Sequence, residues 1–240
     1  MKRWLLLLAL VVLVSVSSLW LWVQVAPLDA IVRGGDGPPS LVLLHGYGSR
    51  AGDWLQFEHQ LQVPQNVRLV FPQGPLRGPG GGRGWWWLNI EGHIPAGERF
   101  PDFSTANPGG IKVASRLVRD LLDREPGAVI LGGFSQGAML SAEIAFQTDQ
   151  PLAALVLLGG TTVNETAWLE GALARKAMPI FIAHGRGDGV LPFAAMERLQ
   201  ARLTEAGLDV TWFPFSGGHN VPDTVIAALN EFLAGVQLGG

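Results

Sequence analysis

A regular alternation of apolar runs and helical stretches after residue 30 is the sequence feature that most constrains the fold. Each run is short, mostly aliphatic and next to glycine or proline, and the runs cover residues 40–46, 67–72, 127–134, 152–160, 178–185 and 208–215. Short continuous apolar runs are typical of strands buried on both faces of a parallel sheet. We therefore expect these segments to form the strands of one sheet.

Stretches with helical spacing lie between or after the runs, at residues 110–122, 135–147, 193–206 and 221–233. In one of them Phe193, Met196, Leu199 and Leu203 recur every three or four residues, as on the buried face of a helix. Strands that alternate with helices predict an α/β domain with helices on both faces of a mostly parallel central sheet. No internal repeat or linker interrupts the pattern, so we expect residues 30–240 to form one domain.

The first 29 residues have a different character. Lys2 and Arg3 precede an apolar run, residues 4–26, which as a helix would span about 30 Å of hydrocarbon. We favour an uncleaved signal anchor that keeps both bases in the cytoplasm and places the domain outside. The alternatives are a signal peptide cleaved within residues 15–17, giving a secreted or periplasmic protein, and an ordinary buried helix. Both main interpretations predict an exported protein.

Composition excludes several functional classes. The net charge is −3 with no Lys/Arg cluster after residue 3, so a nucleic-acid partner is not expected. The absence of cysteine excludes disulfides, thiolate metal sites and a cysteine nucleophile. No His/Asp/Glu cluster has metal-ligand spacing, and the stretch GPGGGRG lacks the Lys-Ser/Thr ending of a phosphate loop. We therefore expect neither a metal nor another cofactor.

The chemistry starts from Gly133-Phe134-Ser135-Gln136-Gly137, a G-x-S-x-G sequence between an apolar run and a helical stretch. In this context the flanking glycines allow a tight strand-to-helix turn that exposes the serine oxygen above the sheet. An idle serine in a glycine-rich turn is the alternative. We predict Ser135 as a nucleophile.

A serine nucleophile needs a general base and an acid that orients the base. Of the two histidines after Ser135, His219 lies in a glycine-rich loop after the last strand, at the edge where open α/β sheets bind ligands. His184 ends a strand and is expected to be a structural histidine with satisfied ring nitrogens. Asp188 follows the same strand and falls at the ligand-binding edge, whereas Asp209 opens a strand at the opposite edge. We predict His219 as base and Asp188 as acid, in the chain order of α/β-hydrolases.

The segment LLHGYGSRAGDW, residues 43–54, is expected to complete the site. A strand that ends in His-Gly with small residues after it leaves backbone N–H groups free to face a developing oxyanion. The expected donors are the backbone N–H groups of Tyr47 and of Gln136, the residue after the nucleophile.

Three consecutive tryptophans lie in a long proline- and glycine-rich connection, residues 73–109. A connection of this length in a compact domain is usually functional or disordered, and the tryptophans argue against disorder. In an extended run Trp85 and Trp87 would share a face opposite Trp86. We expect one face to line the acyl or alcohol pocket; the alternative is a loop that is only pinned by aromatic burial.

The stretches LLHGYGS, FPQGP, RGWWWL, GGFSQGAM, HGRGD and GGHN follow one another as in the phospholipase/carboxylesterase family, which this chain resembles over about residues 38–235. That family consists of serine esterases, is mostly cytosolic and includes the acyl-protein thioesterases. The resemblance implies an α/β-hydrolase fold with Ser135 as nucleophile, Asp188 as acid, His219 as base, and Tyr47 and Gln136 as oxyanion donors. The apolar N-terminus and the third tryptophan depart from the family pattern.

Together these features predict a serine hydrolase that cleaves carboxylic ester or thioester bonds of small to medium acyl substrates through an acyl-enzyme. The segment between Gly160 and Met178 is too short for a separate lid domain. Three alternatives stay open: an amidase or peptidase on the same fold, a lipase that acts at interfaces, and a catalytically silent membrane-anchored binding protein. The expected partners are a small-molecule ester or thioester and, through residues 4–26 if uncleaved, a membrane; the oligomeric state is not predicted.

Overall fold

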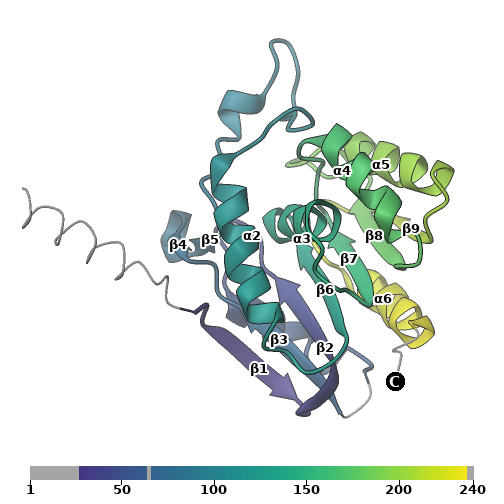
Figure 1. Cartoon of the computed structure of the whole chain (residues 1–240). Helices are drawn as coiled ribbons and strands as arrows, with labels where there is room; N and C mark the ends of the chain where they lie inside the picture. Colours follow the sequence, from purple (N-terminus) through teal and green to yellow (C-terminus); the bar gives the residue numbers. More distant parts are fainter. Residues whose placement is uncertain (1–26, 64–65, 237–240) are drawn as a thin grey trace, which may run out of the picture.

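The computed structural model describes residues 27–63 and 66–236. A seven-stranded sheet with the order β1-β3-β2-β6-β7-β8-β9 runs through the molecule (Figure 1). Its strands are β1 (Ala30–Gly34), β2 (Gly37–Leu44), β3 (Val67–Pro72), β6 (Val129–Phe134), β7 (Ala154–Leu158), β8 (Ile180–Gly185) and β9 (Val210–Phe215). β1 pairs antiparallel with β3, and the other neighbouring pairs are parallel. The predicted mostly parallel central sheet is confirmed.

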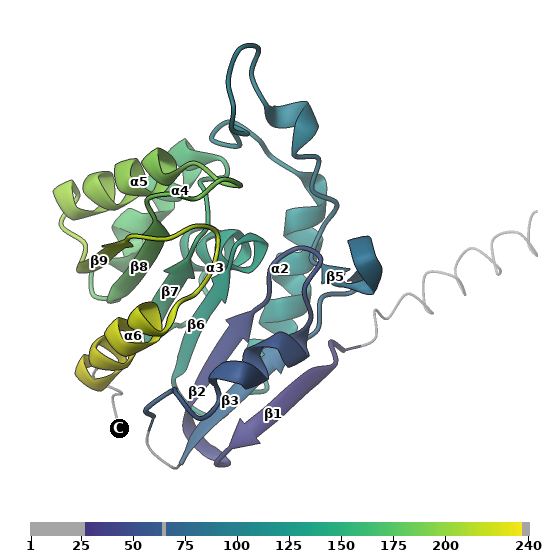
Figure 2. The ribbon, with the colours of Figure 1, turned by 180° about the vertical axis from the view of Figure 1, so that it is seen from behind.

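Helices cover both faces of this sheet, as the pattern predicts. They are α2 (Gly109–Leu122), α3 (Gln136–Gln147), α4 (Glu165–Ala172), α5 (Phe193–Glu205), α6 (Asp223–Gly235) and a 3₁₀ helix, Ala51–Phe57. Figures 1 and 2 show α2 to α5 on one face and α6 with the 3₁₀ helix on the other. Two separate apolar cores result, one on each side of the sheet.

Strand β2 illustrates why its apolar run is continuous. Val42 and Leu44 belong to the core under α2 and α3, whereas Leu41 and Leu43 belong to the core under the 3₁₀ helix and α6. All four side chains are fully buried. Because alternate side chains enter opposite cores, none of these four positions faces water, and each burial contributes about 1.5–3 kcal/mol to the free energy of folding.

Among the strands of the central sheet and the α-helices, two elements lie outside the sequence-based expectations. β1 is a mostly exposed edge strand of five residues that include an arginine, so its sequence lacks the apolar run from which a strand is predicted. α4 has eight residues, too few for a clear helical repeat. Its position depends on a contact that only the fold creates: the Trp168 indole N–H donates to the buried Glu143 carboxylate at 2.7 Å.

The long proline- and glycine-rich connection leaves the sheet after β3. It contains a two-stranded ribbon, β4 (Leu76–Arg77) with β5 (Arg83–Gly84). Between β5 and α2 the chain extends away from the body of the molecule, at the top of Figure 1. Within the described residues no separate lid domain covers the sheet.

No helix in the described part of the chain is long and apolar enough to cross a membrane. Residues 4–26, on which the predicted anchor and signal peptide rest, lie outside the described residues.

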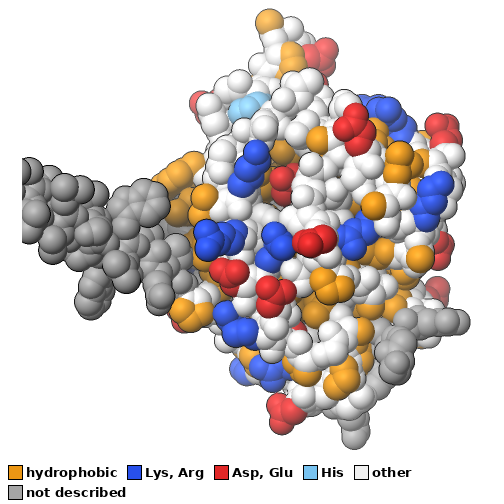
Figure 3. All heavy atoms as spheres, in the orientation of Figure 1, with side chains coloured by type: hydrophobic (Ala, Val, Ile, Leu, Met, Phe, Trp, Pro, Cys, Tyr) orange, Lys and Arg blue, Asp and Glu red, His pale blue; other side chains and the backbone are white. Residues whose placement is uncertain are grey.

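The face that carries α2 to α5 has a mixed surface charge. Figure 3 shows basic and acidic side chains interspersed there, with apolar side chains between them. Arg119 on α2, for example, pairs with Asp149 beyond α3 at 3.1 Å. This face therefore presents no broad field of one sign to a charged partner.

Candidate active site

Ser135 occupies the turn between β6 and α3 in a strained backbone conformation, with φ 56° and ψ −117°. Such conformations cost about 1–3 kcal/mol and persist where the surroundings impose them. The two flanking glycines provide the space. A Cβ at Gly133 would lie 2.5 Å from the carbonyl carbon of Gly137, and one at Gly137 would lie 2.2 Å from the carbonyl oxygen of Leu44. The strand-to-helix turn thus requires glycine on both sides of the serine.

His219 and Asp188 meet Ser135 from two other loops at the same end of the sheet. Nε2 of His219, in the loop between β9 and α6, lies 3.0 Å from Ser135 Oγ. Nδ1 of the same ring lies 2.7 Å from Oδ2 of Asp188, which follows β8. A carboxylate can only accept, so Nδ1 carries the proton and Nε2 is left to accept from the serine hydroxyl. The structure therefore brings the three predicted residues into one hydrogen-bonded series.

Asp188 is buried but held in its ionised form. Its Oδ1 accepts the backbone N–H groups of Val190 at 2.8 Å and Leu191 at 2.9 Å. Burial by itself raises the pKa of the Asp188 carboxyl, but the contacts from His184, His219 and these two N–H groups outweigh it and hold the pKa well below its usual range. The Asp188 carboxylate therefore stays ionised at the pH values at which the His219 imidazole acts as a base.

His184 does not have the satisfied ring nitrogens that its place at a strand end suggested. The ring is fully buried, and among the described residues neither nitrogen has a hydrogen-bond partner of good geometry. Nε2 nevertheless lies 3.2 Å from Asp188 Oδ2, the oxygen that also accepts from His219. The distance suits a hydrogen bond but the direction does not, so we regard this as a polar contact between a second imidazole and the acid.

Acid is expected to destabilise the fold because two buried carboxylates, Asp188 and Glu165, have lowered pKa values. Burial raises the pKa of Glu165, and hydrogen bonds from Arg198 and Arg202 more than offset it. A carboxyl with a lowered folded pKa stabilises the protein above its unfolded pKa, and this contribution is lost as the pH falls. The free energy of unfolding should therefore drop below about pH 4, by up to about 1.4 kcal/mol per pH unit for each group.

Denaturant unfolding between pH 7 and pH 3 measures this dependence. Asp188→Asn should flatten it, and Asp209→Asn, a change of an exposed carboxyl, should leave it unchanged. A free energy of unfolding that is constant down to pH 3 would contradict the expected loss.

The two N–H groups predicted as oxyanion donors lie beside the nucleophile. Gly46, just before Tyr47, approaches Ser135 so closely that a Cβ on it would lie 3.2 Å from Ser135 Cβ. Gln136 follows Ser135 and begins α3. Among the described residues, neither the N–H of Tyr47 nor that of Gln136 donates to another backbone group. Both donors are thus available to a ligand.

The side chain of Gln136 has a second role that the sequence did not reveal. It is fully buried; its Oε1 accepts the backbone N–H of Trp85 at 2.9 Å, and its Nε2 donates to the backbone carbonyl of Trp86 at 2.8 Å. The Trp85 indole N–H in turn donates to the backbone carbonyl of His45 at 2.8 Å. One tryptophan therefore ties the residue after the nucleophile to the loop that carries Tyr47.

The His45 ring extends this set of hydrogen bonds around Gln136 and Trp85, which we call the brace. Its Nδ1 lies 2.8 Å from the backbone carbonyl of Gly46, and its Nε2 accepts the backbone N–H of Gly74 at 2.9 Å. Burial lowers the pKa of His45, which keeps the ring neutral and so able to donate at one nitrogen and accept at the other. The ends of β2 and β3 are joined by this ring.

The expected alternation of the three tryptophans is wrong. Trp85 and Trp86 are both 2% exposed and Trp87 is 69% exposed. The chain bends at Trp85 and Trp86 instead of running extended, so consecutive side chains enter the core. Trp86 packs against Gly110 of α2, where only a glycine fits, because a Cβ on Gly110 would lie 2.7 Å from the Cβ of Trp86. Burial therefore leaves Trp87 as the one of the three with a ring open to a ligand.

Trp85→Phe is expected to lower kcat by about tenfold, because the His45 carbonyl loses its donor and a misplaced oxyanion loop stabilises the transition state less. Steady-state kinetics with a soluble ester measures the effect. The matched control is Trp168→Phe, which also removes a buried indole hydrogen bond but far along the chain, on α4. It should reduce stability and leave kcat unchanged; equal kcat losses in both variants would contradict the proposed brace.

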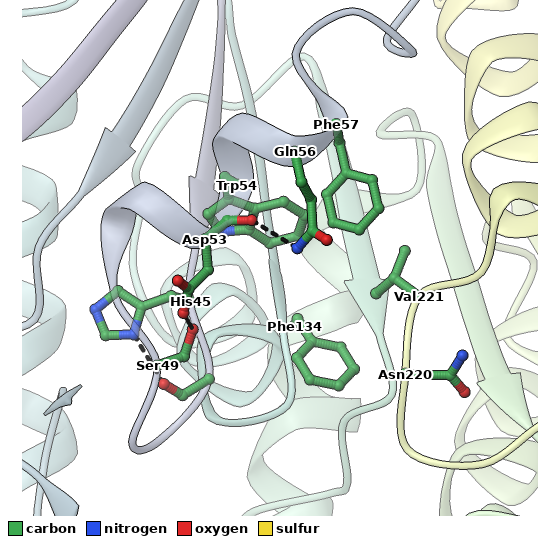
Figure 4. Close-up of a pocket in the computed structure, with 10 residues that line it drawn as sticks. His45, Ser49, Asp53, Trp54, Gln56, Phe57, Phe134, Asn220 and Val221 are labelled. Atoms are coloured by element: carbon green, nitrogen blue, oxygen red, sulfur yellow. Dashed lines mark hydrogen bonds between the residues drawn. The ribbon is translucent and has the colours of Figure 1, made fainter. Parts of the chain in front are cut away.

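A cleft of about 350 Å³ lies beside the nucleophile, between the 3₁₀ helix and the loop that follows His219. Figure 4 shows Phe57, Phe134 and Val221 around the same space from three different elements. Trp54 and Asn220 also line it. None of the three tryptophans at positions 85–87 lines this cleft, so the cleft does not support their predicted role as pocket-lining residues. Within residues 27–63 and 66–236 no group of His, Asp or Glu side chains is placed to hold a metal ion.

Comparisons with known proteins agree with this fold. The sequence profile described as phospholipase/carboxylesterase matches residues 30–237. The chain is 22% identical over 209 residues to acyl-protein thioesterase 1 homolog 1 of Dictyostelium discoideum, covering 81% of this chain and 89% of that one. Among solved structures, esterase PE8 matches with a TM-score of 0.73 and 25% identity, covering 88% of this chain and 100% of the other. Acyl-protein thioesterase 2 of Zea mays matches with a TM-score of 0.70 and 24% identity, over 88% and 99% of the two chains. The predicted α/β-hydrolase fold is confirmed.

The prediction of an exported protein, held outside the cytoplasm by a membrane anchor or released by cleavage, is wrong. Three curated relatives that align with the chain are named acyl-protein thioesterases. The profile match begins only at residue 30, after the apolar segment on which the prediction rested.

Proposed function

The chain belongs to the phospholipase/carboxylesterase family, and from this membership we propose that it hydrolyses carboxylic esters or thioesters with small to medium acyl groups through Ser135, His219 and Asp188. Its kinship with acyl-protein thioesterases and solved esterases makes it an ester or thioester hydrolase. We assign the catalytic unit to residues 30–240. The observation that carries the proposal is the hydrogen-bonded series from Asp188 through His219 to Ser135 Oγ.

The first half of the reaction forms an acyl-enzyme. His219 Nε2 accepts the proton of the Ser135 hydroxyl while its oxygen attacks the acyl carbon and the carbonyl electron pair moves onto the carbonyl oxygen. The N–H groups of Tyr47 and Gln136 stabilise this oxyanion. The tetrahedral intermediate then collapses, the bond to the leaving oxygen or sulfur breaks, and Nε2 returns its proton to the leaving atom.

The second half repeats these steps with water. His219 takes a proton from the water molecule, the hydroxide attacks the acyl carbon, and the proton returns to Ser135 as the acid product leaves. Throughout, Asp188 stabilises the imidazolium and keeps the ring in the tautomer that leaves Nε2 free to accept. Its lowered pKa supports this role because the carboxylate stays ionised.

We retain Trp87 as a substrate contact in this proposal, since its ring is exposed and follows the braced residues Trp85 and Trp86 directly. Trp85 and Trp86 do not contact the substrate in this proposal; they position Gln136 and the loop that carries Tyr47. With no separate lid domain in the described residues, a short acyl group reaches Ser135 without a domain opening.

A fluorophosphonate probe followed by peptide mass spectrometry tests the proposal, together with rates on esters, acyl thioesters and matched amides. We expect the label on Ser135 and faster cleavage of esters or thioesters than of amides with the same acyl group. Labelling at another residue would overturn the assigned nucleophile. Faster amide cleavage would favour an amidase, and an unlabelled protein with no activity would favour a binding role.

A further inference from the structure

We propose that the cleft between the 3₁₀ helix and the loop after His219 binds the leaving-group half of the substrate, and that this half is an uncharged, apolar alcohol or thiol. The assignment rests on the proposed function and goes beyond it by naming which part of the substrate the cleft selects. It depends on three observations: where the cleft opens, which catalytic group it adjoins, and what its walls are made of.

The cleft adjoins the nucleophile through two of the residues that line it. One is Gly46, where an added Cβ would lie 3.2 Å from Ser135 Cβ. The other is Phe134, the residue before the nucleophile. A group attached to a carbon bonded to Ser135 Oγ can therefore extend into this space.

The neighbouring catalytic group identifies which half of the substrate extends there. The leaving atom must come within hydrogen-bond reach of His219 Nε2, because that nitrogen returns the proton to it. The residues that follow His219, Asn220 and Val221, form one wall of the cleft, and the Phe134 ring packs on the imidazole with 4.7 Å between centroids. The substituent of the leaving atom therefore continues past His219 into the cleft.

The walls determine the chemical class of that substituent. Trp54, Phe57, Phe134 and Val221 make the larger share of the cleft surface apolar (Figure 4), and the polar side chains in its lining are His45, Ser49, Asp53, Gln56 and Asn220. Among the described residues that line it there is no lysine or arginine, and the one carboxylate, Asp53, already accepts from the Ser49 hydroxyl at 2.6 Å and the Arg50 N–H at 3.0 Å. An anionic leaving group finds no counter-charge here. An aliphatic or aromatic leaving group, in contrast, is stabilised because its apolar surface is removed from water.

Two ester series separate the halves of the substrate. One keeps acetyl constant and lengthens the alcohol from methyl to hexyl; the other keeps methanol constant and lengthens the acyl group from acetyl to hexanoyl. In Val221→Trp, which fills the cleft, the kcat/KM ratio of hexyl acetate to methyl acetate should fall at least about tenfold, since each buried methylene is worth about fourfold. The ratio of methyl hexanoate to methyl acetate should stay within about twofold.

Two further variants keep the test decisive. Val113→Trp makes the same change at an exposed position of α2 and should alter neither ratio. Phe57→Ala widens the cleft and should raise the rate on cyclohexyl acetate relative to methyl acetate, which a folding defect would not do. For the wild type, hexyl acetate should be cleaved at least about tenfold faster than the acetyl ester of 6-hydroxyhexanoate, whose leaving group carries a carboxylate.

If Val221→Trp lowers the acyl ratio instead of the alcohol ratio, the cleft binds the acyl group and the inference is overturned. Unchanged ratios in both Val221→Trp and Phe57→Ala would overturn it as well. A wild-type protein that cleaves neither series and takes no fluorophosphonate on Ser135 would refute the proposed function and this assignment together. Cleavage of both series with the wrong ratio affected refutes the assignment alone.

Discussion

Alanine at position 135 is expected to lower kcat on any cleaved ester by about 10⁶-fold, with little change in KM. The substitution removes the oxygen that attacks the acyl carbon but leaves Tyr47, Gln136 and the cleft as they are. What remains is the stabilisation of the oxyanion and the orientation of the substrate, which still exceed the uncatalysed rate by about 10³–10⁴. Initial rates at high enzyme concentration, with circular dichroism to verify the fold, measure the loss.

Ser115→Ala is the matched control, since Ser115 is a buried serine in α2, outside the site. It should keep kcat within about twofold, because small changes away from a site rarely alter it. A kcat for Ser135→Ala within about tenfold of the wild type would mean that another group attacks the acyl carbon.

Asparagine at position 188 is expected to lower kcat by about 10⁴-fold while preserving the size of the side chain. The Asp188 carboxylate accepts from Nδ1 of His219 at 2.7 Å and so keeps the proton on that nitrogen. An amide that presents its NH₂ group to the ring favours the other tautomer, in which Nε2 points a hydrogen at Ser135 Oγ and cannot take the proton. The positive charge that develops on the imidazole also loses its counter-charge.

The measurement is kcat and KM for one ester across pH 6 to 9, because an altered tautomer is not restored by raising the pH. Asp209→Asn, an equivalent change in an exposed residue at the opposite end of the strands, should leave the profile unchanged. If Asp188→Asn retained more than about a tenth of the wild-type kcat, the carboxylate would not orient the base.

Ser135, His219 and Asp188 could be predicted as a set because each follows the carboxyl end of a strand, and parallel strands deliver such positions to one edge. The groups that hold them in place could not be predicted. Gln136 reaches the Trp85 backbone 51 residues earlier in the chain. His184 contacts the acid through Nε2, which lies 3.2 Å from Asp188 Oδ2. Both contacts depend on side-chain directions that no periodicity encodes.

The same distinction separates the predicted elements from the missed ones. Five of the parallel strands, β2, β3, β6, β7 and β8, are continuous apolar runs because both of their faces are mostly buried, so the pattern is visible in the sequence. β1 lies at an edge and is mostly exposed, and α4 has only eight residues, of which Trp168 and Ala172 supply its buried apolar side chains. The tryptophan run was misjudged because alternation applies to an extended chain, and this chain bends at Trp85 and Trp86.

The two hydrogen bonds between the Gln136 side chain and the backbone of Trp85 and Trp86 also fix the start of the stretch that projects from the molecule. Trp86 and Phe103 are both buried and mark where the projecting stretch leaves the body and rejoins it. Most residues between these two points are exposed or half-exposed. The stretch therefore projects from a fixed base, because buried aromatic side chains anchor both of its ends and the hydrogen bonds to Gln136 hold the chain at the first of them.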